Sequence, residues 1–337
     1  MLKNKNILFS TDNIVGYKES VENALKKRFL EVEYIEEYLP TKEKRSLGFK
    51  ILREISKNFN DKNIIKKIYK NLERKNIKKI LNKYKFKFDY FLVVAGREFS
   101  KEFLEILKEY NPEIKCILFL WDAFEETSLR KSSSEFDYIF SFDQKDCEKY
   151  GFIFRPSFFS DLYLKNTDEK SIDFYYIGAL RERKRYEIAL NFYNYCKKNN
   201  LKCFIKIYVN KINKYLLPDN YVEDIVTFDK IKYLKNIELT KKSKVILDIN
   251  HSNQGGLTLR SIEGLASKSK IITTNKSIKN YDFYHRNNIL IVDEIDKIDS
   301  IPLEFFKIKF KEVPESIASI YTAAGFIKDI FNEIISN

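Results

Sequence analysis

The 337-residue sequence has few of the residues that build disulfide frameworks, metal centres or membrane spans. Its four cysteines show no CxxC spacing, and its two histidines are too few for a histidine-based metal site. No apolar run approaches the roughly 18 residues that a transmembrane helix needs. Residues 1–12 lead directly into a strand-like run and lack the layout of a signal peptide. No convincing loop carries an Asp-x-Asp motif. We therefore expect reduced thiols, no metal, no cofactor and a cytoplasmic protein.

Lysines and arginines are abundant along the chain, but the net positive charge comes from one segment. Only 9 glycines and 6 prolines beside many Lys, Asn and Ile are typical of an AT-rich genome, whose codon bias would spread lysines over the whole chain. Residues 41–87 instead contain 17 Lys and Arg against 4 Asp and Glu, which accounts for the whole net charge of +13. Apolar residues recur there at helical spacing, so the segment predicts basic amphipathic helices. Such helices suit an anionic membrane surface, and a merely solvated helix face is the alternative. The lysines chosen for membrane contact are Lys66, Lys67, Lys78 and Lys79.

Strand-like and helical runs alternate along both halves of the chain, which is typical of doubly wound α/β domains. In the first half, strands are expected at 6–11, 31–35, 88–95, 115–120, 136–142 and 152–154, and helices at 20–29 and 101–110. A polar stretch at 155–171 marks the boundary. In the second half, strands are expected at 174–177, 204–209, 225–228, 244–249, 270–274 and 289–292, and a final helix at 317–335.

The stretch 244–275 combines a buried strand, a glycine loop, a helix and a second strand. Two adjacent glycines, Gly255 and Gly256, let a ligand approach the backbone, and Thr258 is a plausible helix N-cap. Arg260 and Glu263 lie on one face of that helix, near the positive end of its dipole. A carboxylate in this place can grip vicinal hydroxyls. The alternative is a solvated surface pair.

The pattern T-x-R-x-x-E-G-L-A at residues 258–266 resembles the donor-binding helix of glycosyltransferases with the GT-B fold. It looks most like the branch of CgeB-like proteins and of capsule and lipopolysaccharide biosynthesis enzymes. The resemblance implies that Glu263 holds the ribose of a nucleotide-sugar, while the glycine loop and helix N-terminus face its diphosphate and sugar. Glu263→Gln should then weaken donor binding and barely change folding. Many such enzymes carry an acid where this chain has Gln254 or Gly255. The implied donor contacts of this region are His251, Asn253, Gln254, Gly255, Thr258, Arg260 and Glu263; His251 has a strand cap as its alternative.

A second basic cluster, RERKR at 181–185, follows the first strand of the second half. Basic residues at a helix N-terminus after a glycine are suited to clamping a diphosphate. The family resemblance assigns this role to Gly178, Arg183 and Lys184, with Arg181 a close competitor. A solvated charge run is the alternative.

Several acids follow the carboxyl ends of strands in the first half, where parallel sheets bind ligands. Asp12, Glu98, Asp122 and Asp143 are of this kind, and for each an Asx turn or helix cap is the alternative. The runs ILFLWDAFEETS and EFDYIFSFDQKDCEKYG also resemble the N-terminal domain of capsule-type glycosyltransferases. Asp122, beside the only tryptophan, and Glu98 are the candidate catalytic bases.

We expect a GT-B architecture, an α/β protein of two Rossmann-like doubly wound parallel-sheet domains facing an interdomain cleft. Residues 1–160 form the acceptor domain with the basic segment, 161–316 the nucleotide-sugar domain, and 317–337 a helix packing back on the first domain. The expected activity is metal-independent glycosyl transfer from a nucleotide-sugar to a lipid-linked or membrane-proximal glycan or glycolipid, at the inner face of the cell membrane and without nucleic acid. A CDP-polyol phosphotransferase of the same fold and a basic nucleic-acid-binding protein are the alternatives.

Overall fold

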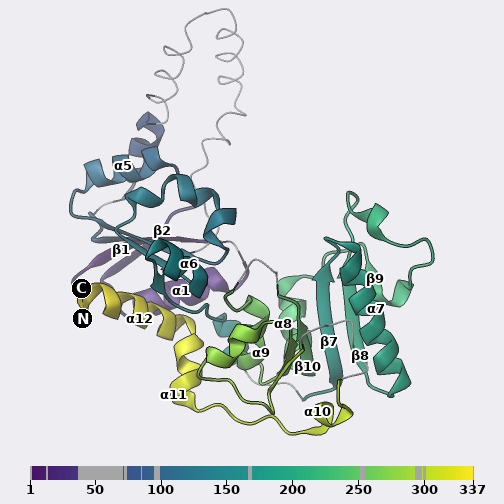
Figure 1. Ribbon diagram of the computed structural model, residues 1–337. Coiled ribbons are helices and arrows are strands. Elements are labelled where there is room, and N and C mark those ends of the chain that lie inside the picture. Colours follow the sequence, from purple (N-terminus) through teal and green to yellow (C-terminus); the bar gives the residue numbers. More distant parts are fainter. Residues whose placement is uncertain are drawn as a thin grey trace, which may run out of the picture. The chain divides into compact units, whose positions relative to one another are not determined.

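The computed structural model describes residues 2–12, 14–36, 71, 74–84, 86–94, 99–165, 169–250, 255–292, 298 and 301–336 (Figure 1). The chain divides into two compact units. The first comprises 1–13, 21–155 and 334–337, and the second comprises 14–20 and 156–333. The division after Arg155 lies close to the predicted limit at residue 160.

The first unit is built on a six-stranded parallel sheet in the order β2-β1-β3-β4-β5-β6. Its strands are β1 (Asn6–Thr11), β2 (Glu31–Tyr34), β3 (Tyr90–Val94), β4 (Lys115–Leu120), β5 (Tyr138–Ser141) and β6 (Ile153–Phe154). Its helices are α1 (Tyr17–Lys26), which both units share, a helix over residues 74–81, α5 (Lys101–Tyr110) and α6 (Gln144–Tyr150). Three 3-10 turns, η1 (Phe124–Glu126), η2 (Ser128–Lys131) and η3 (Ser133–Glu135), follow β4.

Alternation along the strands of this sheet sends side chains to opposite faces. On one face, Phe91 and Val93 of β3 pack in a core with Phe103 and Leu107 of α5. Ile77 on the 74–81 helix joins the same core with no exposure. This burial explains the apolar periodicity of the basic segment's C-terminal part, because the helix covers the sheet with that face.

The second unit holds another six-stranded parallel sheet, in the order β12-β11-β10-β7-β8-β9. Its strands are β7 (Ile172–Ala179), β8 (Cys203–Tyr208), β9 (Val226–Thr227), β10 (Ser243–Asp248), β11 (Lys270–Thr273) and β12 (Ile289–Ile291). Counted from β7 along the chain and read from β9 to β12, the order is 3-2-1-4-5-6, that of a Rossmann domain. Its helices are α7 (Arg183–Lys198), α8 (Tyr233–Lys241), α9 (Leu259–Ala266), α10 (Leu303–Lys307), α11 (Glu315–Ala318) and α12 (Ala323–Ser336), with 3-10 turns η4 (Asp161–Leu164), η5 (Lys214–Leu216), η6 (Glu223–Ile225), η7 (Lys276–Asn280) and η9 (Ser319–Tyr321).

Helices cover both faces of the second sheet, as Figure 1 shows for α7 on one side of β7 and β8 and for α8 and α9 on the other. Phe174 of β7 stacks on Phe192 of α7, with ring centroids 4.6 Å apart. The next residue, Tyr175, points to the opposite face, into the core of α8 and α9. The two helices that follow β7 and β10 in the sequence therefore approach the sheet from opposite sides.

Most predicted strands are confirmed, and the predicted helix at 101–110 coincides with α5. The expectation of one helix at 317–335 is wrong: α11, the η9 turn and α12 occupy this range, and Thr322 caps α12 by accepting a hydrogen bond from the backbone N–H of Gly325 at 3.0 Å. Helix α8 was not predicted. Among the described residues, no helix has the length and apolar character needed to cross a bilayer.

Candidate functional site

The strand order of the second unit reverses between β7 and β10, and ligands of open α/β sheets bind beside the carboxyl ends of strands at such a switch point. The two strands are parallel neighbours, so their carboxyl ends meet at one edge. Gly178 lies at the end of β7 and Asp248 at the end of β10. The N-termini of α7 and α9 follow at the same edge, one on each face. Positive helix ends and backbone N–H groups therefore converge on one place.

The start of α9 is held by a buried aspartate that the sequence did not single out. Thr258 is the N-cap, as predicted, and its side chain accepts from the N–H of Ser261. Asp248, only 3% exposed, accepts from the hydroxyls of Thr258 at 2.7 Å and Ser261 at 2.6 Å, and also from Thr273 at 3.3 Å. Burial raises the pKa of Asp248, while these hydroxyl donors oppose the rise. The three hydrogen bonds tie α9 to the ends of β10 and β11.

Glu263 is buried, with 4% exposure, so the alternative of a solvated surface pair is wrong. Its Oε1 accepts a hydrogen bond from the hydroxyl of Tyr233 at 2.7 Å. Its Oε2 lies 3.6 Å from Nη1 of Arg260, and the two residues form an ion pair between neighbouring turns of α9. A buried carboxylate needs such partners, because an unpaired one would cost several kcal/mol. These contacts favour a different outcome from the expectation that changing Glu263 barely affects folding, because its partners would lose the carboxylate.

Arg260 is held by groups from two other elements. Its Nη1 donates to the side-chain oxygen of Asn236 on α8 at 3.0 Å, and its guanidinium lies 5.6 Å from the ring centroid of Tyr175 on β7. About a fifth of the side chain stays exposed. Burial lowers the pKa of Arg260, but the charge of Glu263 acting together with Tyr175, Tyr163 and Asp248 outweighs it, so the pKa is raised and the cation persists. Arg260 thus offers a fixed positive charge at the start of α9.

Three tyrosines surround the Glu263 carboxylate: Tyr233 of α8, Tyr17 of α1 and Tyr163 of η4, all grouped with the second unit. Burial, followed by the charge of Glu263, raises the pKa of each phenol. The phenols therefore stay protonated and can donate hydrogen bonds to a carboxylate or to a ligand oxygen.

At the start of α7 the predicted basic residues differ in exposure. Arg181, Arg183 and Lys184 are exposed, and Arg183 pairs with Glu187 at 3.5 Å. Arg185, which was not chosen from the sequence, is the one whose side chain is largely buried, at 16% exposure. A Cβ at Gly178 would come within 2.5 Å of the Tyr176 hydroxyl, so the strand end leaves no room for a larger residue without moving that ring. The cluster therefore consists of one largely buried cation, Arg185, and three exposed ones.

The remaining predicted residues fall into three groups. Glu98, His251, Asn253, Gln254, Lys66 and Lys67 lie outside the described residues. Gly255 lies next to α9, and its carbonyl accepts from the hydroxyl of Ser277. In the first unit Asp122 is exposed after β4, Lys78 and Lys79 are exposed on the 74–81 helix, and Asp143 is a buried N-cap of α6 that accepts from the N–H of Lys145 at 3.0 Å. Asp143 is thus a structural cap. Over the described ranges, no three or more His, Cys, Asp or Glu side chains gather as metal ligands would.

Sequence comparison finds no matching family model and no matching curated protein. Solved structures are similar over nearly the whole chain. The UDP-forming alpha,alpha-trehalose-phosphate synthase from Burkholderia xenovorans matches with a TM-score of 0.60 and 10% identity, covering 99% of each chain. The lipopolysaccharide outer core galactosyltransferase WaaB in its apo form matches at 0.58 and 11%, covering 98% of this chain and 99% of that one. The UDP-GlcNAc 2-epimerase from Methanocaldococcus jannaschii in complex with UDP-GlcNAc and UDP matches at 0.51 and 14%, covering 97% and 99%.

These likenesses, together with the two six-stranded parallel sheets, show that the chain has the predicted GT-B fold of two Rossmann-like domains. At identities of 10–14%, these structural likenesses show the fold alone. The reaction has to be argued from the site.

Proposed function

We propose that the protein is a glycosyltransferase of the CgeB-like, capsule and lipopolysaccharide biosynthesis type. It transfers a sugar from a nucleotide-sugar to a lipid-linked or membrane-proximal glycan in surface polysaccharide synthesis. The observation that carries this proposal is the buried Glu263–Arg260 pair at the start of α9, at the switch point of the second sheet. Burying a carboxylate costs free energy, which an exposed position would avoid. Glu263 and its partner Arg260 are nevertheless buried at the edge of the sheet where ligands bind, which favours a role in binding.

Glu263 is suited to hold the ribose of the donor. A carboxylate can accept about four hydrogen bonds, and among the described residues Tyr233 donates one to Oε1. Oε2 lies beyond hydrogen-bond distance of Arg260 at 3.6 Å, so it retains capacity for a vicinal hydroxyl. The surrounding protonated phenols favour a neutral polyhydroxyl group over an additional anion at this point.

The leaving nucleoside diphosphate needs positive charge that is in place before the bond breaks. The N-terminus of α9, with Thr258 as its cap, supplies backbone N–H groups, and Arg260 supplies a guanidinium. Arg181, Arg183 and Lys184 at the start of α7 supply further cations, and Arg185 adds a less exposed one. This charge replaces the divalent ion that other transferases use, in keeping with the predicted independence from metal. Asp122 or Glu98 is proposed as the base that deprotonates the acceptor hydroxyl.

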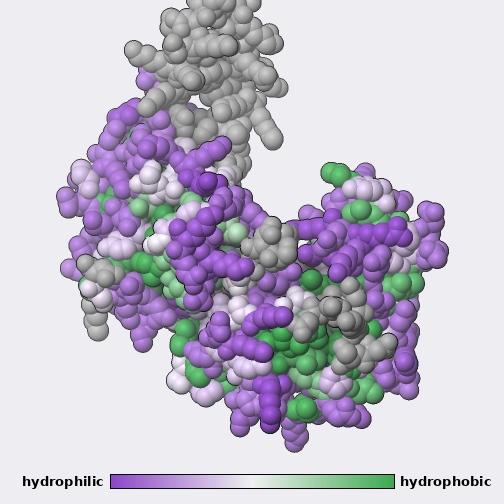
Figure 2. Space-filling view, in the orientation of Figure 1, coloured by the Kyte–Doolittle hydropathy of each residue, from purple (hydrophilic) through white to green (hydrophobic). Residues whose placement is uncertain are grey.

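The acceptor is proposed to be membrane-proximal because residues 41–87 carry the whole net charge. On the 74–81 helix, Lys78 and Lys79 are exposed while Ile77 and Leu81 are buried. The visible face of the first unit is mostly hydrophilic in Figure 2, so electrostatic attraction to anionic lipids is the proposed mode of attachment. The proposed location is the cytoplasmic face of the cell membrane.

One other activity is favoured by a specific likeness, since a UDP-GlcNAc 2-epimerase shares the fold. An epimerase consumes the same kind of nucleotide-sugar but needs no acceptor. A thermal-shift panel of nucleotide-sugars and CDP-polyols identifies the donor, because a ligand at 100 times its Kd stabilises by about 2.7 kcal/mol. The bound donor is then incubated with and without membrane lipid extract. Release of nucleoside diphosphate only with the extract supports transfer; conversion without it identifies an epimerase, and stabilisation by CDP-polyols alone identifies a phosphotransferase.

A further inference from the structure

A second charged cavity lies at the opposite edge of the same sheet, at the amino ends of β7, β10 and β11. We propose that this cavity binds a ligand with two or more linked phosphoryl groups. It has a volume of about 490 Å³ and is lined by Lys170, Asp173, Leu201, Lys244, Lys268, Lys270, Phe306, Lys307, Ile308, Lys309 and Phe310. Six lysines and one aspartate are among these residues, so positive charge is in excess there, although Lys244 pairs with Asp173 and Lys268 with Glu312. Neither α7 nor α9 begins at this edge, so the cavity is separate from the proposed donor site.

The lysines differ in what already holds them. Lys244 pairs with Asp173 at 2.7 Å. Lys170 donates to the carbonyl of Ser267 at 2.7 Å and to the hydroxyl of Ser269, and these acceptors orient its ammonium. Lys307 and Lys309 are exposed and form no ion pair with any described acid. Lys170 and Lys244 are held in place and Lys307 and Lys309 are exposed, an arrangement suited to an anion that bridges several cations.

Lys270 is the most unusual of the six because it is buried, with 3% exposure. Its Nζ donates to the carbonyls of Phe305 and of Ile308, the latter at 2.7 Å, and among the described residues no acid forms an ion pair with it. Burial and then the charge of Lys244 lower the pKa of Lys270 to about 8. A bound polyanion would stabilise the protonated form. Binding near pH 8 is therefore coupled to proton uptake.

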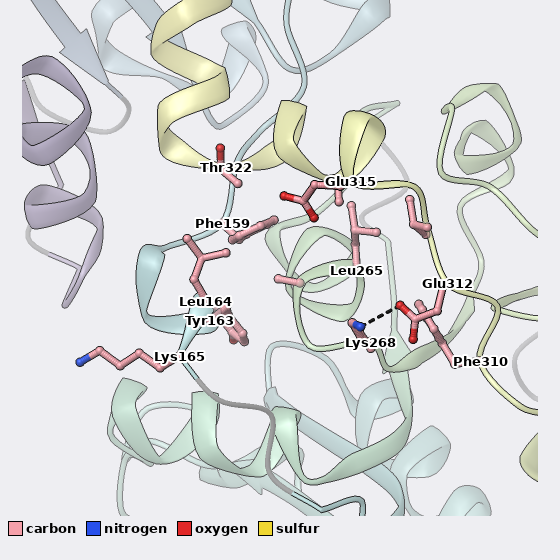
Figure 3. Close-up of a pocket in the computed structure, with 13 residues that line it drawn as sticks. Phe159, Tyr163, Leu164, Lys165, Leu265, Lys268, Phe310, Glu312, Glu315 and Thr322 are labelled. Carbon is pink, nitrogen blue, oxygen red and sulfur yellow. Dashed lines mark ion pairs between the residues drawn. The ribbon is translucent and has the colours of Figure 1, made fainter. Parts of the chain in front are cut away.

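A neighbouring cavity shows that the excess of positive charge is confined to the lysine-lined cavity. The cavity in Figure 3, of about 360 Å³, shares Lys268 and Phe310 with the lysine-lined one. Glu312 and Glu315 lie in it, and Glu312 pairs with Lys268 at 2.7 Å. Its two acids balance its two lysines, Lys165 and Lys268. Positive charge therefore accumulates on one side of Phe310 and not on the other.

The size of the charge excess indicates the class of ligand. Lys244 and Lys268 are already paired with acids, and the remaining lysines come from separate segments. Pyrophosphate or a longer phosphate chain carries more charge than a single phosphate and spans such separate lysines. The chemistry is that of a linked phosphate group, either free in solution or at the end of a larger molecule. The four apolar lining residues leave room for an uncharged part.

The test is calorimetric titration of the full-length protein with pyrophosphate, tripolyphosphate and orthophosphate at pH 8. Lys307→Ala/Lys309→Ala should weaken pyrophosphate binding by at least about tenfold, the factor that about 1.4 kcal/mol represents. Lys279→Ala/Lys328→Ala, two exposed lysines of the same unit elsewhere, is the charge-matched control and should bind normally. Arg183→Ala/Lys184→Ala removes cations from the proposed donor site, where a diphosphate is also expected to bind, and should leave unchanged the binding step that Lys307→Ala/Lys309→Ala weakens.

Proton uptake, measured in buffers of different ionisation enthalpy, gives a second reading of the site. Wild type should take up a fraction of a proton on binding at pH 8, and Lys270→Met should not. Loss of pyrophosphate binding in the Arg183→Ala/Lys184→Ala variant alone would place the anion at the donor site and overturn the proposal. Failure of all three phosphates to bind saturably would overturn it too, including the case in which only vesicles with phosphatidylglycerol bind. Neither result bears on donor binding at α9, which Glu263 variants test.

Discussion

Glutamine in place of Glu263 keeps the shape of the side chain and removes one charge from the buried cluster around α9. Two effects follow from the structure. The donor should bind about tenfold to a hundredfold more weakly, because a charge-assisted hydrogen bond to a ribose hydroxyl contributes roughly 1.5–3 kcal/mol. The free protein should also become less stable, because Arg260 loses the carboxylate that lies 3.6 Å from its Nη1.

The size of the stability loss can be bounded from the contacts. Removing one partner of a fully buried ion pair costs about 3–5 kcal/mol. Arg260 keeps its hydrogen bond to Asn236 and about a fifth of its exposure, and the glutamine oxygen can still accept from Tyr233. We therefore expect a loss of about 1–3 kcal/mol. At about 2–4 °C per kcal/mol for domains of this size, the Tm should fall by several degrees.

Calorimetry of donor binding well below the Tm, with thermal melts of each free protein, separates the two effects. Glu238→Gln is the matched control, because Glu238 lies on α8 of the same unit but is paired at the surface with Lys235 at 2.8 Å and Lys242 at 2.9 Å. It should leave donor binding unchanged and alter the Tm far less than Glu263→Gln does, since solvent screens exposed ion pairs. Unchanged donor affinity in Glu263→Gln would refute the donor role, and an unchanged Tm would refute the account of the buried pair.

Three further predictions test other parts of the molecule. Thr258→Ala should lower the stability by about 1 kcal/mol, as the loss of an N-cap does, and should also weaken donor binding; a change in melting alone would mean that the N-terminus of α9 does not meet the ligand. A hydrogen bond from Cys196 lowers the pKa of Cys203, so Cys203 should be alkylated first at pH 7.5. Burial raises the pKa of Cys116 to about 12, so Cys116 should stay unmodified in the native protein. The reverse order, found by peptide mass spectrometry, would contradict this. Reversing the charge of four lysines of the basic segment, Lys66, Lys67, Lys78 and Lys79, should release the protein from vesicles that contain anionic lipid at physiological salt. If the variant still co-sediments with these vesicles, the membrane role of this segment is excluded.

The sheets were predictable from sequence because their strands are buried on both faces. Runs such as residues 116–120 are continuously apolar and end in polar residues, and the structure places β4 over Lys115–Leu120. Helix α5 was equally clear, since Ser100 caps it and Phe103, Leu104 and Leu107 follow helical spacing. Local pattern and final burial agree in these elements, so short-range reasoning is sufficient.

The cluster around Glu263 could not be predicted in the same way. Helix α8 has no side-chain N-cap and mixes Lys, Asn and Glu among its apolar residues, so its weak periodicity gave no signal. Without α8, Tyr233 and Asn236 could not be assigned as partners of Glu263 and Arg260. Asp248 was missed for a different reason: its partner Thr273 lies on the neighbouring strand, and only the sheet register brings the two together. The break before α12 did have a local signal, because Thr322 precedes Gly325 as an N-cap.

The central claim is that the second unit holds a nucleotide-sugar for transfer to a membrane-associated acceptor. The most direct measurement is phosphorus-31 NMR of the protein with its stabilising nucleotide-sugar and membrane lipid extract, followed by analysis of sugar in the lipid fraction. The account predicts that nucleoside diphosphate appears only with the extract and that the lipid fraction gains one sugar for each diphosphate released. A nucleotide-sugar that stays intact with every extract, or one that is converted without any acceptor, would contradict it.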